Sequence, residues 1–267
     1  MQDFCPARRS VDAMTNNASE ELSLSWKRPA GPLKVWQVIE SKKQSHNGQP
    51  LKFSIQDVPK DRYDDVISHM CQNFARDETI CKSFNVVNDP VALEDFRLLW
   101  RLAIKQGITV GAFIEDPKGG KPVLAGVNVL YVISEGDKRT MKKLSFKSKM
   151  MKDILTLFER MEENSKVEEK YGVKTFMHAV GLSVDPTFRG ESLGEHILRV
   201  RDSIAREFGI PATVTVFTGD VSWKLAARVG FEILTEEKFS DQRDEDGQPV
   251  FPNLKEGSIK LMGKRFL

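Results

Sequence analysis

The chain of 267 residues is long enough to bury one full hydrophobic core. Hydrophobic residues make up 40% and charged residues 29%, as in ordinary globular proteins, and the net charge is only +2. Dedicated nucleic-acid-binding and membrane-surface proteins carry a clear excess of positive charge, which this chain lacks. We therefore expect neither a nucleic acid nor a membrane as a partner.

The cysteines and the apolar runs indicate a cytoplasmic protein. Cys5, Cys71 and Cys81 are too few and too scattered for a disulfide framework or a zinc site. No apolar run follows the charges near the N-terminus, so no secretory signal is expected. The most apolar stretch, residues 123–133, is shorter than the roughly 20 residues that span a bilayer. We expect no metal, because no metal-ligand spacing links the histidines, which we interpret as structural or surface residues: His46, His69, His178 and His196.

The order of the predicted elements is that of an α/β domain. Residues 1–32 are polar and lack periodicity, which predicts a mobile N-terminal tail before a single domain over residues 33–267. Helices are predicted where apolar residues recur at helical spacing, over residues 63–74, 93–104, 150–168, 193–208 and 221–228. Strands are predicted at residues 33–39, 51–56, 108–115, 123–133, 175–184, 212–217, 231–234 and 258–264. This alternation predicts a mixed central β-sheet flanked by helices.

The most informative segment is residues 182–194, where a strand runs through a glycine-bearing turn into a helix. The helix has one apolar stripe, formed by Leu193, Ile197, Val200, Ile204 and Phe208. A turn of this kind aligns consecutive backbone N–H groups at a helix N-terminus, where they bind phosphate well.

The segment from Arg189 to Gly194 resembles the acetyl-CoA signature Arg/Gln-x-x-Gly-x-Gly/Ala of the GCN5-related N-acetyltransferases, with Ser192 at the middle glycine. Gly230-Phe231, after an alanine-rich helix and a strand, resembles the end of the same superfamily's domain. The resemblance implies that acetyl-CoA is the cosubstrate, with its pyrophosphate at the turn and its amide-bearing arm along the preceding strand. The implied cofactor-binding residues are Leu182, Ser183, Val184, Arg189, Gly190, Glu191, Ser192, Leu193, Gly194 and Glu195.

A closer resemblance, over about residues 50–265, is to the insect arylalkylamine N-acetyltransferases. It is carried by Asp77-Glu78, by the strand residues 182–185, by Ser222 eight residues before Gly230, and by the closing strand 259–264. The resemblance implies that Glu78 is the general base and that Ser183 and Ser222 assist. Thr79 departs from the family, because many members have proline there.

These residue types suit amine acetylation. An alkylamine has a pKa of about 10 and arrives protonated, so a carboxylate such as Glu78 must remove the proton before attack on the thioester. The Val184 N–H is a candidate oxyanion donor, and Ser222 a candidate proton donor to the leaving thiolate. A tyrosine acid is absent, because Ala226 occupies its usual position in the superfamily.

Simpler interpretations of these residues remain open. Glu78 can be a solvated carboxylate at a helix C-terminus, Ser192 a helix cap, and Ser222 the cap of the next helix. Phe74, Phe84 and Phe217 are candidates for an aromatic-amine pocket.

Three functions are compatible with the sequence. The first is N-acetylation of a primary amine, in particular an arylalkylamine such as dopamine, tyramine or serotonin. The second is N-acetylation of a polyamine or of agmatine by the same fold. The third is a non-catalytic acyl-CoA-binding module. We expect a monomer with a small-molecule amine as its other substrate.

Overall fold

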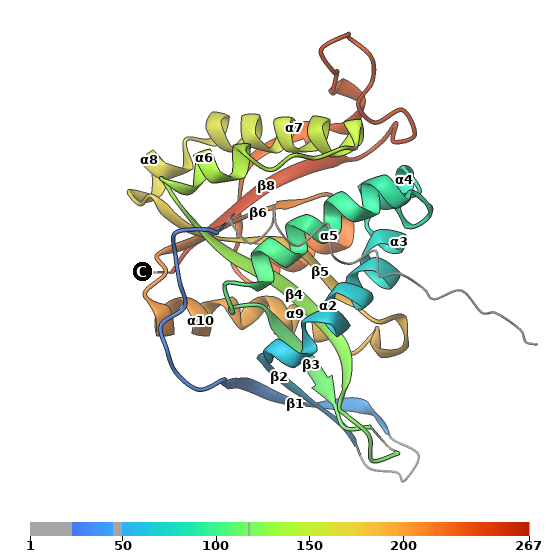
Figure 1. Ribbon diagram of the computed structural model, residues 1–267, viewed down its shortest axis with the longest axis vertical. Helices are drawn as coiled ribbons and strands as arrows, with labels where there is room; N and C mark the ends of the chain where they lie inside the picture. Colours follow the sequence, from blue (N-terminus) through green and yellow to red (C-terminus); the bar gives the residue numbers. More distant parts are fainter. Residues whose placement is uncertain (1–22, 45–49, 117, 267) are drawn as a thin grey trace, which may run out of the picture.

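The structure is a computed structural model that describes residues 23–44, 50–116 and 118–266. In these residues eight strands form one sheet, in the order β1-β2-β3-β4-β5-β6-β8-β7 (Figure 1). All neighbours are antiparallel except β5 and β6, so the mixed sheet predicted from the sequence is confirmed. The strands are β1 (Val35–Gln44), β2 (Pro50–Asp57), β3 (Val110–Ile114), β4 (Val123–Ser134), β5 (Thr175–Val184), β6 (Ala212–Phe217), β7 (Glu232–Lys238) and β8 (Ser258–Arg265).

Helices cover both faces of the sheet (Figure 1). One face carries α2 (Tyr63–His69), α5 (Pro90–Ile104) and α7 (Lys149–Ser165), and the other carries α9 (Leu193–Arg199), α10 (Arg201–Phe208) and α11 (Asp220–Arg228). The remaining α-helices are short: α3 (Ala75–Asp77), α4 (Thr79–Ser83), α6 (Asp137–Lys142) and α8 (Val167–Tyr171). No helix in the described part of the chain is long and apolar enough to cross a membrane.

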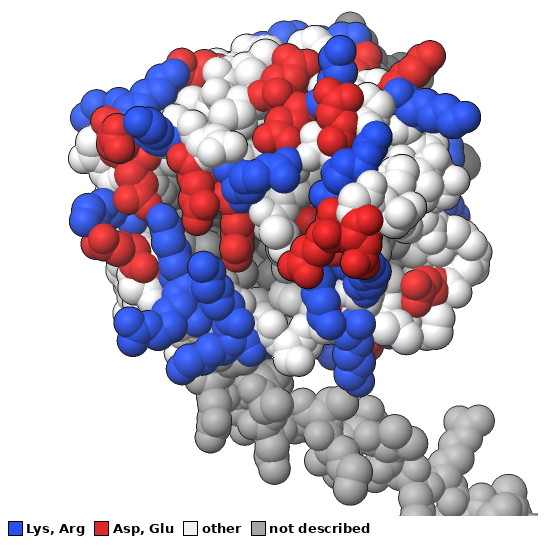
Figure 2. Space-filling model, turned by 90° about the horizontal axis from the view of Figure 1, so that it is seen from above, with Lys and Arg blue, Asp and Glu red and all other residues white. Residues whose placement is uncertain are grey.

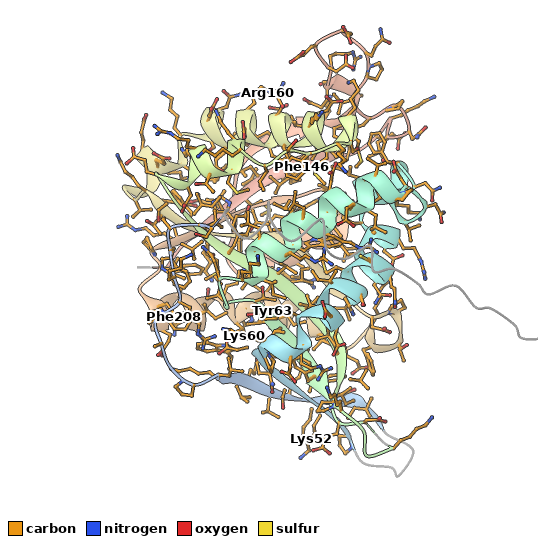
Figure 3. All side chains as sticks on the ribbon, in the orientation of Figure 1. Lys52, Lys60, Tyr63, Phe146, Arg160 and Phe208 are labelled. Carbon is orange, nitrogen blue, oxygen red and sulfur yellow. The ribbon has the colours of Figure 1, made fainter. Side chains whose placement is uncertain are left out.

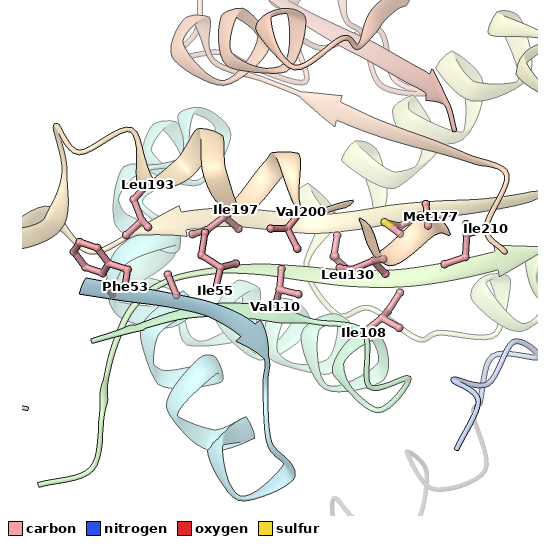
Figure 4. Close-up of a cluster of buried hydrophobic side chains, with 14 of the residues drawn as sticks. Phe53, Ile55, Ile108, Val110, Leu130, Met177, Leu193, Ile197, Val200 and Ile210 are labelled. Carbon is pink, nitrogen blue, oxygen red and sulfur yellow. The ribbon is translucent and has the colours of Figure 1, made fainter. Parts of the chain in front are cut away.

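The apolar stripe after the signature turn forms the main core, as its spacing predicts. Leu193, Ile197 and Val200 pack against Ile55 and Val110 of the sheet (Figure 4). On the opposite face, Phe146 lies between α5 and α7 in a second cluster with Leu99 and Met151 (Figure 3). The core therefore fixes the helix that begins at the signature turn against the centre of the sheet.

Three predicted helices are interrupted, and the one predicted over residues 193–208 is divided at Val200 into α9 and α10. The helix predicted over residues 63–74 widens into a π-helical turn at Met70–Phe74. The one predicted over residues 150–168 ends at Ser165, because Lys166 takes a left-handed conformation with φ 48° before α8 begins.

The tail predicted over residues 1–32 is partly wrong. Residues 1–22 lie outside the described residues, but Leu24 is only 2% exposed and packs on the domain. The Arg28 guanidinium forms a 2.7 Å ion pair with Asp57, whose side chain is fully buried. The folded domain therefore includes residues that precede Leu33.

The sheet opens between β5 and β6. These strands pair with each other only at Phe176 with Ala212 and at Met177 with Thr213. Beyond these pairs, β5 pairs only with β4 and β6 only with β8. A bulge on β5 lies at this point, because β5 advances three residues from Ala179 to Leu182 while β4 advances two. Gly181, within the bulge, has φ +108°, a conformation that favours glycine. The result is a gap in the middle of the sheet, next to the signature turn.

Candidate active site

A cavity of about 1310 Å³ passes through this part of the molecule. Its walls include β5 on both sides of the bulge, the start of α9, and inward-facing residues of α5 and α7. Glu78, Ser183 and Ser222 all line it, so the structure brings together the three side chains that the family resemblance singled out.

Glu78 lies where α3 ends and α4 begins. Its backbone is extended, with φ −64° and ψ 140°, and its Oε2 accepts a 2.7 Å hydrogen bond from the Cys81 N–H. Its Oε1 accepts a hydrogen bond from the Thr218 hydroxyl, on the loop after β6. Glu78 is thus both the C-cap of α3 and the N-cap of α4. Its half-buried carboxylate is hydrogen-bonded at the N-terminus of α4, which favours negative charge. A carboxylate has about four lone-pair positions, so acceptor capacity remains for a substrate proton or a water.

Ser183 is held by a histidine from another element. Its side chain, 6% exposed, has its hydroxyl 3.1 Å from His69 Nε2 on α2, and His69 Nδ1 lies 3.3 Å from the Asn73 amide nitrogen. Burial lowers the pKa of His69, although the Asp185 charge opposes the shift. With the amide donating to Nδ1, the neutral imidazole donates from Nε2, which leaves the Ser183 hydroxyl proton available to the cavity.

Ser222 has a local partner. Its hydroxyl donates a 2.7 Å hydrogen bond to the Gly219 carbonyl, within the first turn of α11. A Cβ built on Gly219 would lie 2.8 Å from Thr79 Oγ1 and 3.8 Å from Ser222 Oγ, so the three residues are in close contact. To donate a proton to a ligand, the Ser222 hydroxyl must rotate away from Gly219.

The signature turn exposes its backbone donors. Gly190 has φ +85°, and Ser192 adopts a left-handed conformation with φ 55°. Ser192 occupies the N-cap position of α9, but its side chain makes no capping hydrogen bond. Within the described chain, no backbone hydrogen bond uses the N–H groups of Gly190, Ser192, Leu193 or Gly194. This turn can therefore bind an anionic group through its backbone, as the sequence predicts.

The charged residues of the turn are engaged with protein groups. Arg189 pairs with Asp77, next to Glu78, and its Nε donates to the Val184 carbonyl at 3.1 Å. Glu191 accepts a 2.6 Å hydrogen bond from the Ser41 hydroxyl. Glu195 pairs with Arg199 at 2.7 Å, and its N–H donates to the Ser192 carbonyl. Both the N–H and the carboxylate of Glu195 therefore already have protein partners, so neither group is free to bind the cofactor as the resemblance implies.

The peptide groups of Leu182 and Val184 face the gap in the sheet. The Asp185 N–H donates to the Ala125 carbonyl of β4 at 2.9 Å. Backbone groups alternate in direction along a strand, so those of Val184 and Leu182 point away from β4, toward the opening. The Leu182 peptide groups are placed to pair with an extended ligand, whereas the Val184 carbonyl already accepts from Arg189 Nε. The Val184 N–H remains a candidate oxyanion donor.

A buried arginine spans the point where the strands part. Arg201, 1% exposed, donates to the Asn128 side chain at 2.9 Å and to the Thr215 hydroxyl at 2.8 Å. Asn128 in turn donates to the Gly181 carbonyl at 2.8 Å. Burial lowers the pKa of Arg201 to about 9. The network joins β4, β6 and the bulge of β5, and so fixes the opening between the strands.

Two of the three phenylalanines named as candidates for an aromatic-amine pocket reach the cavity. Phe74 and Phe217 line the cavity, whereas Phe84 packs against Phe251. In the described residues, no group of three or more histidine, cysteine, aspartate or glutamate side chains is placed to hold a metal ion.

Comparison with known proteins identifies the family. No family model matches the chain, and neither does any curated protein sequence. Among solved structures, a yellow fever mosquito (Aedes aegypti) protein designated arylalkylamine N-acetyltransferase 7 is 30% identical, with a TM-score of 0.80, over 91% of this chain and 100% of that one. The chain belongs to the insect arylalkylamine N-acetyltransferase family. Its fold is that of the GCN5-related N-acetyltransferases.

Two further structures extend the comparison. The mosquito arylalkylamine N-acetyltransferase-like 5b is 28% identical, with a TM-score of 0.67, over 80% of this chain and 99% of that one. The Drosophila melanogaster polyamine N-acetyltransferase has a TM-score of 0.65 over the same shares but is 17% identical, and so shows the shared fold alone. The structure of this arylalkylamine N-acetyltransferase family member thus agrees with the resemblance seen in its sequence.

The sequence analysis missed several residues that line the cavity or contact its side chains. Thr218 contacts Glu78 across 140 positions, and His69 contacts Ser183 across 114. His178, interpreted as a structural or surface histidine, lines the cavity. The sequence carries one signal for the contact between His69 and Asn73, because residues four positions apart lie on the same face of a helix.

Proposed function

We propose that this protein transfers the acetyl group of acetyl-CoA to the primary amine of an arylalkylamine. The observation that supports the proposal most is one cavity lined by Glu78, Ser183 and Ser222 and bordered by the donors of the signature turn. A relative of 30% identity that covers nearly the whole chain supports the same substrate class.

The residues of the turn fit acetyl-CoA. A pyrophosphate matches the N–H groups of Gly190, Ser192, Leu193 and Gly194, and a pantetheine arm matches the peptide groups of β5 that face the gap. When bound, acetyl-CoA supplies an activated thioester. The residues of the turn and of β5 would orient that thioester toward the Glu78 carboxylate, which lines the same cavity.

Glu78 then removes the ammonium proton, directly or through one water. Its contacts to Cys81 and Thr218 fix the carboxylate in place. The Val184 N–H offers a donor to the negative charge that develops on the thioester oxygen. Ser222 lies in the first turn of α11, and its hydroxyl can protonate the departing sulfur after rotation away from the Gly219 carbonyl.

A second candidate, N-acetylation of a polyamine or agmatine, has one supporting observation. Glu159, Glu162 and Glu163 of α7 line the cavity and could meet a second cation. Lys138, Lys142 and Lys166 line the same region, and acidic and basic side chains stand side by side on this side of the molecule (Figure 2). The carboxylates therefore do not form an uninterrupted acidic surface, and we place the arylalkylamine first.

The test is release of CoA from acetyl-CoA with a panel of amines, with mass spectrometry of the products. We expect N-acetylated products from tyramine, dopamine or serotonin with higher kcat/KM than from agmatine or spermidine. The opposite ranking would favour the second candidate. Binding of CoA without turnover of any amine would instead indicate a non-catalytic acyl-CoA-binding module.

A further inference from the structure

The cavity continues beyond the gap along β4 and β5 to a polar inner end. His178, on β5, is 8% exposed and lines the cavity, and its Nε2 has no hydrogen-bond partner in the described residues. A buried polar nitrogen without a partner is unfavourable, because it has lost its water and gained nothing in return. A ligand group that reaches this nitrogen would remove the penalty.

Two further polar groups surround His178. Tyr131 is its direct cross-strand neighbour on β4 and stacks on it, with ring centroids 5.5 Å apart and an interplanar angle of 30°. Glu162 of α7 is half-buried and lines the same part of the cavity. Burial lowers the pKa of His178 and raises that of Tyr131, so both rings are neutral at physiological pH. The inner end thus presents a neutral imidazole and the Glu162 carboxylate, with Lys138 as a nearby cation.

The walls between the gap and this inner end are apolar. Aromatic and aliphatic side chains from α5, α7 and the π-helical turn form them: Phe74, Phe96, Leu99, Met151, Ile154, Leu155 and Phe158. Such walls suit an aromatic ring, whereas a polyamine would place charged nitrogens against them. The distance also suits a short substrate, since four residues of bulged strand between His178 and Leu182 span roughly 10 Å.

We propose that His178 is a specificity-determining residue that binds the distal hydroxyl of a hydroxylated arylalkylamine. This proposal rests on the function proposed above and names the substrate class more closely. The aromatic ring lies between the apolar walls, and the amine points toward Glu78. The hydroxyl oxygen accepts from His178 Nε2–H and donates its one proton to the Glu162 carboxylate. A site built around a substrate hydroxyl discriminates strongly against the analogue that lacks it, because its polar groups are then left unpaired.

The test compares tyramine with phenethylamine, which lacks only the hydroxyl. For the wild-type protein we expect kcat/KM to favour tyramine by about tenfold or more. In His178→Phe, which keeps a ring against Tyr131 but removes both nitrogens, the ratio should fall to about 1. The matched control is His196→Phe, since His196 lies on α9, contacts Gln37 and is outside the cavity lining, and it should keep the wild-type ratio.

Several outcomes would overturn the proposal. The first is a wild-type ratio within about twofold of 1, which needs no variant and holds even if His178→Phe does not fold. The second is an unchanged ratio in His178→Phe, including an equal loss of activity on both amines, which would point to a role in the reaction itself. The third is preference for putrescine over tyramine, which would assign the inner end to a second cation. Acetylation of neither aromatic amine would contradict the proposed function as well.

Discussion

Ser192 offers a substitution whose effects on stability and on ligand binding can be separated. It stands where the superfamily signature has glycine, and it adopts φ 55° without a side-chain capping hydrogen bond. A left-handed conformation costs a residue with a Cβ about 1–2 kcal/mol. Ser192→Gly removes this strain but adds about 0.5–1 kcal/mol of unfolded-chain entropy. We therefore expect the free energy of unfolding to rise by about 0.5–1 kcal/mol.

The matched control is Ser203→Gly, at the third residue of α10, where the backbone is right-handed helical. Glycine is less favourable than serine there, so the same substitution should lower the free energy of unfolding by about 0.5 kcal/mol. Urea denaturation of the two variants should thus give shifts of opposite sign. A loss of stability in Ser192→Gly would refute the assignment of strain to this residue.

Calorimetry with CoA supplies the second measurement on Ser192→Gly. The binding donors proposed here are backbone N–H groups, so the affinity should be unchanged or better when the Cβ is removed. A tenfold loss, about 1.4 kcal/mol, would show instead that the Ser192 hydroxyl contacts the ligand.

Three further predictions address the cofactor turn, the N-terminal segment and the buried histidine. Gly194→Val adds two methyl groups beyond a Cβ that would already lie 3.5 Å from Leu182 Cδ2, and CoA affinity measured by calorimetry should fall about tenfold or more. Arg28→Met leaves the buried Asp57 carboxylate without its cation, and the free energy of unfolding should drop by about 3 kcal/mol in urea denaturation; no change would mean that the N-terminal segment is dispensable. Burial lowers the pKa of His178, so below about pH 6.5 the unfolded state binds more protons and the native state loses stability as pH falls; His178→Phe should reduce this dependence between about pH 7 and pH 5, with the buried His69 supplying the part that remains.

Local patterns were sufficient to predict most of the elements. The stripe Leu193, Ile197, Val200 and Ile204 is contiguous in sequence and packs as its spacing predicts. The helix that begins at the signature turn and the strand before it therefore follow from the sequence alone. The positions of Glu78, Ser183 and Ser222 came from the family resemblance, and the structure places all three on one cavity.

What the sequence could not predict depends on contacts between distant residues. Leu24 and Arg28 lie in a segment without periodicity, and only Asp57 and the core beneath them reveal that they pack. The gap between β5 and β6 depends on a bulge whose register is set by pairing with β4. The unpartnered nitrogen of His178 follows from burial by two neighbouring elements, which no local pattern records.

The most direct test of the central claim is Glu78→Gln, which keeps the shape of the side chain and removes the proton acceptor. General-base loss costs about a hundredfold in rate, so kcat/KM for tyramine should fall by about that factor while calorimetric affinity for CoA is unchanged. The control is Glu94→Gln on α5, an exposed glutamate that pairs with Arg97 and lies outside the cavity lining; it should retain full activity. Activity of Glu78→Gln within about twofold of wild type across several amines would show that another group takes the proton and would contradict the account.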